Sequence, residues 1–295
     1  MMIIKNTKIL EMVPPLRVRE RMSLRQRLRS TPWWLVAIFA IALLTVWEIT
    51  TNSAFANAFT FIKAGLSVTL TTTLISFTIS LIFGLILSLG RISTNVIWNN
   101  ASTFYVEVVR GVPMLVLIFF IALVLIPGFT LGLQNLAPTF QNLGLTHIAS
   151  TLKGLKTSAV PMNVRAIIAL AVTYSAFLAE IFRAGFQSVD PGQMEAARSQ
   201  GMTYSQAMFY IILPQALKNI LPALGNDFIS LLKDSSLVSI LAVRDITQVA
   251  KLYAGSTFEY NTTYTTLAVM YLTMTILLSF LVKILERRMN TNGKQ

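Results

Sequence analysis

Two pairs of charged residues lie in segments of the chain that are otherwise strongly apolar. Glu180 and Arg183 are three residues apart and therefore share one face of a helix, whereas the adjacent Lys233 and Asp234 cannot share a face. An ionised side chain inside a membrane costs roughly 2.5–3.5 kcal/mol by insertion scales, so it usually pairs with another charge or faces a polar cavity. These four residues therefore either hold helices together or contact a ligand that carries both signs of charge.

Glu107 and Arg110 form a third pair with helical spacing, at the start of another apolar segment. Long side chains in the first turns of a membrane span reach the surface at little cost. We therefore expect Glu107 and Arg110 to form a structural or gating ion pair. Ser235 and Ser236 directly follow Asp234 and could add hydroxyl groups to a polar pathway.

The scarcity of catalytic residue types argues against an enzyme. The chain has no cysteine and one histidine, His147. Disulfides, thiol catalysis and cysteine-bound metals are therefore excluded, and a metal or acid–base site built from histidines is disfavoured. No nucleophile–base pair is evident. A G-x-x-x-x-G-K-[ST] phosphate loop is also missing, so the chain has no such ATP site of its own.

The composition is that of an integral membrane protein. Of 295 residues, 54% are hydrophobic and 12% are charged, about half the charged fraction of an ordinary soluble domain. A membrane helix needs about 20 apolar residues. The sequence therefore predicts an all-α protein with six transmembrane helices at 33–50, 66–89, 104–128, 162–182, 219–241 and 262–285.

The net charge of +12 is explained by topology rather than by nucleic acid, because the cations gather at the ends of the predicted spans. Cytoplasmic loops are enriched in Lys and Arg. The basic leader and the tail 289–295 therefore lie inside, which requires an even number of spans. The loops 91–104 and 183–218 are then cytoplasmic, and the loop 128–161 faces outward.

The first span has an alternative interpretation as a secretory signal. A basic region, an apolar stretch and the small-residue pattern Ala54-Phe55-Ala56 occur in the order that a cleaved signal requires. The basic region of about 30 residues is longer than a signal peptide of 15–30 residues allows. We therefore expect residues 1–60 to remain as a leader and an extra helix, while cleavage after Ala56 stays open.

The first part of the segment 183–218 predicts a short helix outside the membrane. Asp190 is a good N-cap, Pro191 suits the first helical position, and Gln193 stands where a capping box needs Glu or Gln. Gly201 suits the left-handed conformation that often ends a helix. A turn is therefore expected at this glycine.

A second short helix is predicted at 206–212. Thr203 or Ser205 can cap its start, and Pro214 ends or bends it because proline lacks the N–H that a helix needs. The result is a helix–turn–helix whose first helix exposes small alanine side chains. Small side chains allow another protein surface to approach closely.

The same segment resembles the EAA loop of ATP-binding-cassette importer permeases. That motif has the form EAA-x3-G-x9-I-x-LP, and every fixed position matches, at Glu195, Ala196, Ala197, Gly201, Ile211, Leu213 and Pro214. Other segments resemble the polar amino-acid subfamily, at 63–73, 107–113, 179–185, 222–227 and 232–237. The resemblance covers about 60–288 and implies a permease domain at 61–288. The leader, the extra helix and the loop 128–161 inherit nothing from it.

The resemblance implies the membrane subunit of a bacterial inner-membrane importer for polar amino acids. Its EAA loop would sit on a separate ATPase subunit, which binds ATP and Mg²⁺, while this chain holds no cofactor. The implied partners are two ATPase subunits, a second permease that is identical or a sister chain, an extracytoplasmic binding protein and membrane lipid. A secondary carrier driven by an ion gradient is the alternative, and the EAA loop argues against it.

The resemblance also suggests roles for the buried charges. An amino acid carries a carboxylate and an ammonium group, so Arg183 or Lys233 would meet the former and Glu180 or Asp234 the latter. Ion pairing among these residues is the competing interpretation. Which amino acid is carried stays open.

Overall fold

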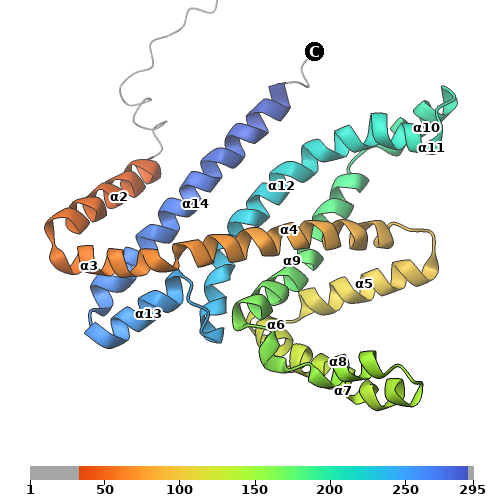
Figure 1. The fold of residues 1–295 in the computed structure, drawn as a ribbon. Coiled ribbons are helices and arrows are strands. Elements are labelled where there is room, and N and C mark those ends of the chain that lie inside the picture. The colour runs from red at the N-terminus through yellow and green to blue at the C-terminus, as the bar shows by residue number, and fades with distance from the viewer. Residues whose placement is uncertain (1–32, 292–295) are drawn as a thin grey trace, which may run out of the picture. The chain divides into compact units, whose positions relative to one another are not determined.

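The computed structural model describes residues 33–291, and all regular structure within that range is helical. The leader cations and the last four residues lie outside the described residues. The elements in chain order are α2 (Trp33–Thr51), α3 (Ser53–Ile62), η1 (Lys63–Gly65), α4 (Leu66–Arg91), α5 (Val96–Gly111), α6 (Met114–Phe119), η2 (Phe120–Leu125), α7 (Ile126–Asn142), α8 (Thr146–Gly154), η3 (Thr157–Ala159), α9 (Met162–Gln187), α10 (Pro191–Ser199), α11 (Tyr204–Ala207), η4 (Met208–Ile212), α12 (Leu213–Asp234), η5 (Ser235–Leu241), α13 (Ile246–Thr257) and α14 (Tyr260–Thr291), shown in Figure 1.

The chain divides into two units, Met1–Leu44 and Thr45–Gln295. The described part of the first unit is helical and belongs to α2, which coincides with the first predicted span. Within the described residues, five helical stretches are long and apolar enough to cross a membrane, at Ser53–Arg91, Met114–Asn142, Met162–Gln187, Tyr204–Leu241 and Tyr260–Arg287. These overlap the second to sixth predicted spans, so the all-α membrane fold is confirmed with five candidate crossings. The first predicted span, 33–50, stays a prediction.

The third span begins later than predicted. The sequence placed its start near Phe104, but α5 ends at Gly111 and the candidate span starts at Met114. Val112 is extended, with φ −102° and ψ 136°, because a residue that precedes a proline is sterically disfavoured in the helical region. Glu107 and Arg110 consequently lie at the end of a separate helix rather than in the first turns of the span.

The same span also continues beyond Pro127, where the sequence predicted its end. Residues Phe120–Leu125 form a π-helical turn, and the N–H of Ile126 donates to the carbonyl of Ile121, five residues back. In that register the carbonyl of Ala122 would need the N–H of residue 127, which a proline lacks. The helix therefore passes the proline but leaves the Ala122 carbonyl without a backbone donor.

Arg165 supplies the missing donor. Its Nη1 donates to the Ala122 carbonyl at 3.1 Å, its Nε donates to Val160 at 3.0 Å, and its Nη2 donates to Thr157 at 2.5 Å. The side chain is buried, and all three acceptors are backbone carbonyls. Arg165 thus ties the start of α9 to the π turn and to the chain that leads into α9.

The segment 128–161, predicted as a loop, is mostly helical. It is occupied by α7, α8 and the short 3-10 turn η3, and Gly144 makes the sharp connection with φ +77°. The Gln134 amide donates to the Leu155 carbonyl and holds the two helices together. We call α7 and α8, residues 126–154, the outer hairpin.

Helices α4 and α9 run parallel in close contact. Ser76 Oγ donates to the Ile167 carbonyl at 3.2 Å, and one turn later Ser80 Oγ donates to the Ala171 carbonyl at 3.1 Å. Another turn on, a Cβ at Gly84 would lie 2.8 Å from a side chain of α9. Small and hydroxylated residues let membrane helices approach closely, so this stripe of α4 serves packing.

The start of α13 packs against the start of α4. A Cβ at Gly65 would lie 2.6 Å from the backbone of Asp245, and the Ile246 N–H donates to Thr69 Oγ1 at 3.1 Å. Asp245 caps α13 by accepting the N–H of Gln248 at 2.8 Å. Burial raises the pKa of the Asp245 carboxyl.

The Arg165 contact gives a test of the π turn. Arg165→Met should destabilise the protein, because each buried carbonyl that loses its donor costs about 1–3 kcal/mol. Pro127→Ala restores an N–H near the Ala122 carbonyl. The double variant should therefore lose less free energy of unfolding than the sum of the losses in the two single variants. Thermal unfolding of the purified complex measures this coupling.

Pro138→Ala is the matched control, since Pro138 lies inside the same helix α7. A new N–H at residue 138 cannot reach Ala122. The proposed contact would be contradicted if Pro138→Ala offset the destabilisation by Arg165→Met as much as Pro127→Ala does. It would also be contradicted if the effects of Arg165→Met and Pro127→Ala on stability simply added.

Candidate functional site

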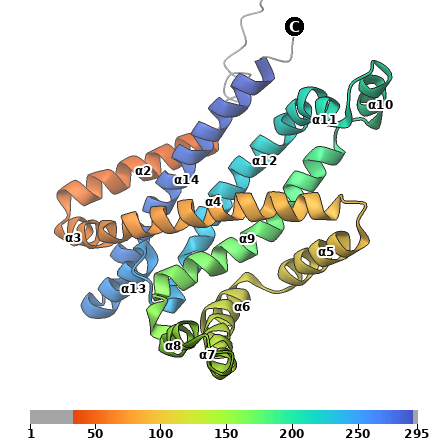
Figure 2. The same ribbon diagram turned by 45° about the vertical axis from the view of Figure 1, so that its right-hand side comes forward.

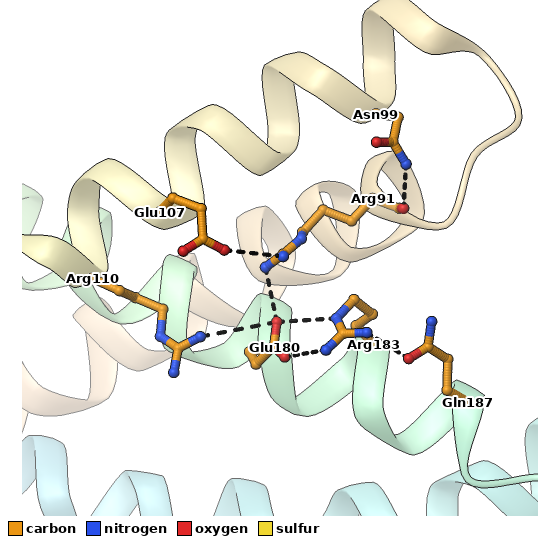
Figure 3. Close-up of polar contacts among 7 residues, drawn as sticks. All are labelled: Arg91, Asn99, Glu107, Arg110, Glu180, Arg183 and Gln187. Carbon is orange, nitrogen blue, oxygen red and sulfur yellow. Dashed lines mark hydrogen bonds and ion pairs between the residues drawn. The ribbon is translucent and has the colours of Figure 1, made fainter.

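Five charged side chains meet where α4, α5 and α9 come together, as Figure 3 shows. Glu180 is at the centre of this cluster. Its Oε2 lies 2.8 Å from Arg91 Nη1 and 4.0 Å from Arg110 Nη1, and its Oε1 pairs with Arg183. Arg91 also contacts Glu107, with Nη2 3.2 Å from Oε1. We call these five residues the arginine–glutamate cluster.

The predicted pair of Glu107 with Arg110 is therefore wrong. Glu107 pairs with Arg91 at the end of α4, and Arg110 turns to Glu180 and also stacks on Phe177, with 5.8 Å from its Cζ to the ring centroid. Arg91 went unnoticed as a site residue because the sequence marks it only as the cation that ends an apolar run. Nothing in a single sequence brings it next to a residue 89 positions away.

The predicted proximity of Glu180 and Arg183 on one helix face is confirmed, and Arg183 Nη1 also donates to Gln187 Oε1 at 2.5 Å. The Glu180 carboxylate thus has three guanidinium neighbours. With three arginines against two glutamates, the cluster has a net charge of +1 (3 − 2). This geometry joins α4, α5 and α9, and it leaves little of Glu180 for a ligand.

The second predicted pair is in a different place. Asp234 accepts a hydrogen bond from Tyr174 Oη at 2.6 Å, while Lys233 is exposed. Ser235 is fully buried and donates to the Leu232 carbonyl at 2.7 Å. Tyr174 was missed because an uncharged tyrosine in an apolar helix gives no signal of its partner.

The structure does not gather the four predicted charges into one site. Tyr174, which contacts Asp234, precedes Glu180 by six residues on α9, about 9 Å at 1.5 Å per residue. Lys233 and Asp234 also differ in exposure, since adjacent residues of a helix point in different directions. Asp234 and Tyr174 therefore form a second polar centre apart from the arginine–glutamate cluster. Ser236, two residues further along the chain, is half-buried.

The residues 190–214, which we call the EAA segment, fold largely as predicted. The Asp190 side chain caps α10 by accepting the Gly192 N–H at 2.7 Å. Gly201 ends the turn with φ +84°. Thr203 and Gln206 then form a reciprocal capping box at the start of α11. The helix–turn–helix prediction is thus confirmed in its backbone conformation.

Three details of this segment differ from the prediction. Gln193 makes no capping box and instead accepts a hydrogen bond from Gln215 Nε2 at 3.3 Å. Of the two alanines of the first helix, Ala196 is exposed and Ala197 is buried, whereas both were predicted to be exposed. Pro214 does not end the second helix, because a π turn precedes it and the helix runs on into α12.

The π turn η4 repeats the arrangement seen at Pro127. The N–H of Leu213 donates to the carbonyl of Met208, five residues back, so Pro214 leaves the Phe209 carbonyl without a donor. Phe209 is 66% exposed. Solvent can therefore satisfy that carbonyl, whereas the buried Ala122 carbonyl needs Arg165.

The EAA segment is attached firmly to two long helices. Apolar side chains of α9, α10 and α12 form a common core, and a Cβ at Gly185 would lie 2.1 Å from Ile220 Cγ1. Asn219 Nδ2 also donates to Ser188 Oγ at 2.8 Å. A displacement of α10 would consequently move α9 and α12 with it. Glu195 is exposed and makes no hydrogen bond or ion pair within the described part of the chain.

Comparison with known proteins identifies the family. Residues 80–291 match the family described as "Binding-protein-dependent transport system inner membrane component". The match includes the EAA segment and covers more than half of the chain, so the chain belongs to this family. It is the permease component of an ABC transporter, not itself the ATPase, and an integral membrane protein.

Curated relatives and solved structures agree with this assignment. The chain is 39% identical over 221 residues to the "Probable glutamine ABC transporter permease protein GlnM" of Bacillus subtilis, covering 75% of this chain and 89% of that one. It is 33% identical to the "Arginine transport system permease protein ArtQ" of the same organism, with 79% and 94% covered. A solved structure described as "an amino acid ABC transporter with histidines" aligns at 37% identity and a TM-score of 0.63, covering 77% and 94%. The MetNI methionine transporter, at 19% identity and a TM-score of 0.52, shares the fold.

The arginine–glutamate cluster predicts unequal effects for its two acids. Glu180→Gln leaves three guanidinium groups facing one another without their central carboxylate, so the melting temperature should fall by several degrees. Glu107→Gln should change it little, because the Glu107 side chain is 63% exposed and exposed ion pairs contribute about 0–1 kcal/mol. Thermal unfolding of the two isosteric variants tests this, and equal losses would refute the central role of Glu180.

Proposed function

We propose that this chain is the membrane subunit of an ATP-driven importer that carries polar amino acids delivered by an extracytoplasmic binding protein. The observation that carries the proposal is the EAA segment, which matches the permease motif and is packed onto α9 and α12. The relatives named for glutamine and arginine transport support the class of substrate. ATP and Mg²⁺ belong to two partner ATPase subunits, and a second permease, identical or a sister chain, completes the pathway.

We further propose six crossings of the bacterial inner membrane, with both termini in the cytoplasm. The cations of the leader and tail support this orientation. In Figures 1 and 2, α10 and the C-terminal end of α14 lie toward the same side, and the outer hairpin lies toward the opposite side. The first span is retained in this arrangement as a helix outside the permease domain.

In this proposal the EAA segment docks in a groove of the ATPase. Exposed Glu195 offers a carboxylate for charge-assisted hydrogen bonds, and the small Ala196 lets the two surfaces approach. Movement of the ATPase would then pass through the apolar core behind α10 into α9 and α12. Both helices border the polar centres, so this movement could change access to them.

For substrate recognition, the geometry favours the Asp234 centre over the arginine–glutamate cluster. Glu180 and Arg183 already bind each other, whereas Asp234 has a neutral tyrosine partner and exposed Lys233 beside it. We propose that Lys233 meets the substrate carboxylate and Asp234 its ammonium group, with help from the half-buried Ser236 hydroxyl. The Ser235 hydroxyl is the weaker candidate, because it is buried and already bonded to the Leu232 carbonyl. Glu180 and Arg183 remain the weaker candidates for these roles.

Gly201 tests the coupling role. Its left-handed φ is costly for residues with a Cβ, and most costly for β-branched ones. Gly201→Val should abolish uptake and substrate-stimulated ATP hydrolysis while the complex still assembles in the membrane. Gly201→Asn is the control, because asparagine tolerates this conformation, and it should retain uptake. Uptake by the valine variant at the rate of the unmodified protein would contradict the coupling proposal.

Transport by Lys233→Met, Asp234→Asn and the double variant tests the substrate site. Lost charge-assisted hydrogen bonds of roughly 1.5–3 kcal/mol each predict about tenfold to hundredfold weaker apparent affinity. Proteoliposomes that hold the whole complex, with and without internal ATP, provide the measurement. Normal uptake by the double variant would show that Lys233 and Asp234 do not bind the substrate. Uptake without internal ATP would favour a secondary carrier.

A further inference from the structure

The outer hairpin exposes two stripes of apolar side chains. On α7 the stripe is Phe129, Leu136 and Leu143, spaced seven residues apart, and Phe129 and Leu143 are 67% and 68% exposed. At the start of α8, Leu145 and Ile148 are exposed, and half-buried Leu152 continues the row at helical spacing. Hydroxyl and imidazole groups of His147, Ser150 and Thr151 occupy the other face of α8. The hairpin is therefore amphipathic.

The charge around these stripes is exclusively positive. Residues 111–179 contain no Asp or Glu. Lys153, in the last turn of α8, and Lys156, just beyond it, are both exposed. No carboxylate in this part of the chain would therefore repel an anionic surface.

The hairpin is also continuous with a membrane span but too long to fit in it. The stretch Met114–Asn142 would measure about 44 Å as a straight helix of 29 residues at 1.5 Å each, against a hydrocarbon core of about 30 Å. The residues after the π turn run in a different direction from the long helices. Figure 2 shows α7 and α8 nearly end-on, whereas α9 and α12 are seen lengthwise.

From these observations we propose that the outer hairpin lies in the surface of the outer leaflet and binds anionic phospholipid. The two apolar stripes enter the boundary between headgroups and acyl chains, as in other amphipathic interfacial helices. Lys153 and Lys156 pair with lipid phosphates. Arg165, by holding Ala122, Thr157 and Val160 together, keeps the hairpin at the level of the membrane surface. This inference rests on the outward orientation given under the proposed function.

Fluorescence quenching in the assembled transporter tests the proposal, since the chain has no cysteine of its own. Single cysteines at Leu145, Ile148 and, as a polar-face control, Ser150 carry a bimane label. The complex is reconstituted in phosphatidylethanolamine vesicles with phosphatidylglycerol brominated on its acyl chains. Labels on the apolar stripe should be quenched at least about twofold more than the label at residue 150. Equal quenching of the three labels would overturn the proposal.

Lipid charge is tested with Lys153→Gln combined with Lys156→Gln in the Leu145→Cys background. Brominated phosphatidylglycerol should quench the parent more than brominated phosphatidylcholine at the same content, because each lysine near an anionic surface favours it by about fivefold. The preference should disappear in the lysine variant. A preference that survives would refute phosphate binding by these lysines.

An impermeant thiol reagent on intact cells separates this inference from the topology on which it depends. Asn142→Cys should be labelled from outside. Labelling only after the membrane is opened would reverse the proposed orientation. Outside labelling together with unquenched stripe labels would keep the topology, exclude lipid and leave a protein surface, such as the binding protein, as the occupant.

Discussion

Backbone hydrogen bonding is the constraint on which this fold depends, because a membrane interior offers no water to an unpaired N–H or carbonyl. Among the prolines that lie in long helices, Pro127 and Pro214 are each preceded by a π turn that lets the helix continue. The freed carbonyl is treated differently in the two places. At Ala122 it is bound by Arg165, and at Phe209 it belongs to a residue that is 66% exposed.

The two π turns therefore differ in how firmly hydrogen bonds hold them. Arg165 fixes the π turn at the outer hairpin through three carbonyls, so that end has a tightly defined geometry. The π turn of the EAA segment has no such clamp among the described residues and lies between a glycine turn and α12. Under the proposed coupling role, a helix that continues without interruption from this segment into α12 would pass on movement of the partner.

The charges are divided in a comparable way. The arginine–glutamate cluster joins three helices with alternating signs, which makes it a structural connection at the ends of α4 and α9. Asp234 instead bonds to a neutral tyrosine and keeps its own charge less compensated. A half-buried carboxylate with a neutral partner has more to gain from a cationic neighbour than one that is already paired with arginines.

The sequence by itself determined the membrane class, five of the candidate crossings, the helix–turn–helix of the EAA segment and the family. These features depend on local patterns, such as apolar run length, N-cap residues, a glycine in a left-handed turn and a motif with fixed spacing. Lys233 and Asp234 were correctly separated for the same reason, because adjacent residues on a helix always point apart.

Only the tertiary structure decided which charges meet and where helices pass a proline. Arg91 joins Glu180 across 89 positions, and Arg165 reaches Ala122 across 43, so neither partner is visible from spacing along the chain. The helical outer hairpin was likewise missed, since its glycines and asparagines look like a loop until packing between α7 and α8 offsets their poor propensity. The Arg91 contact depends on the packing of α4 against α9 and the Arg165 contact on the packing of α9 against η2, neither of which a local pattern specifies.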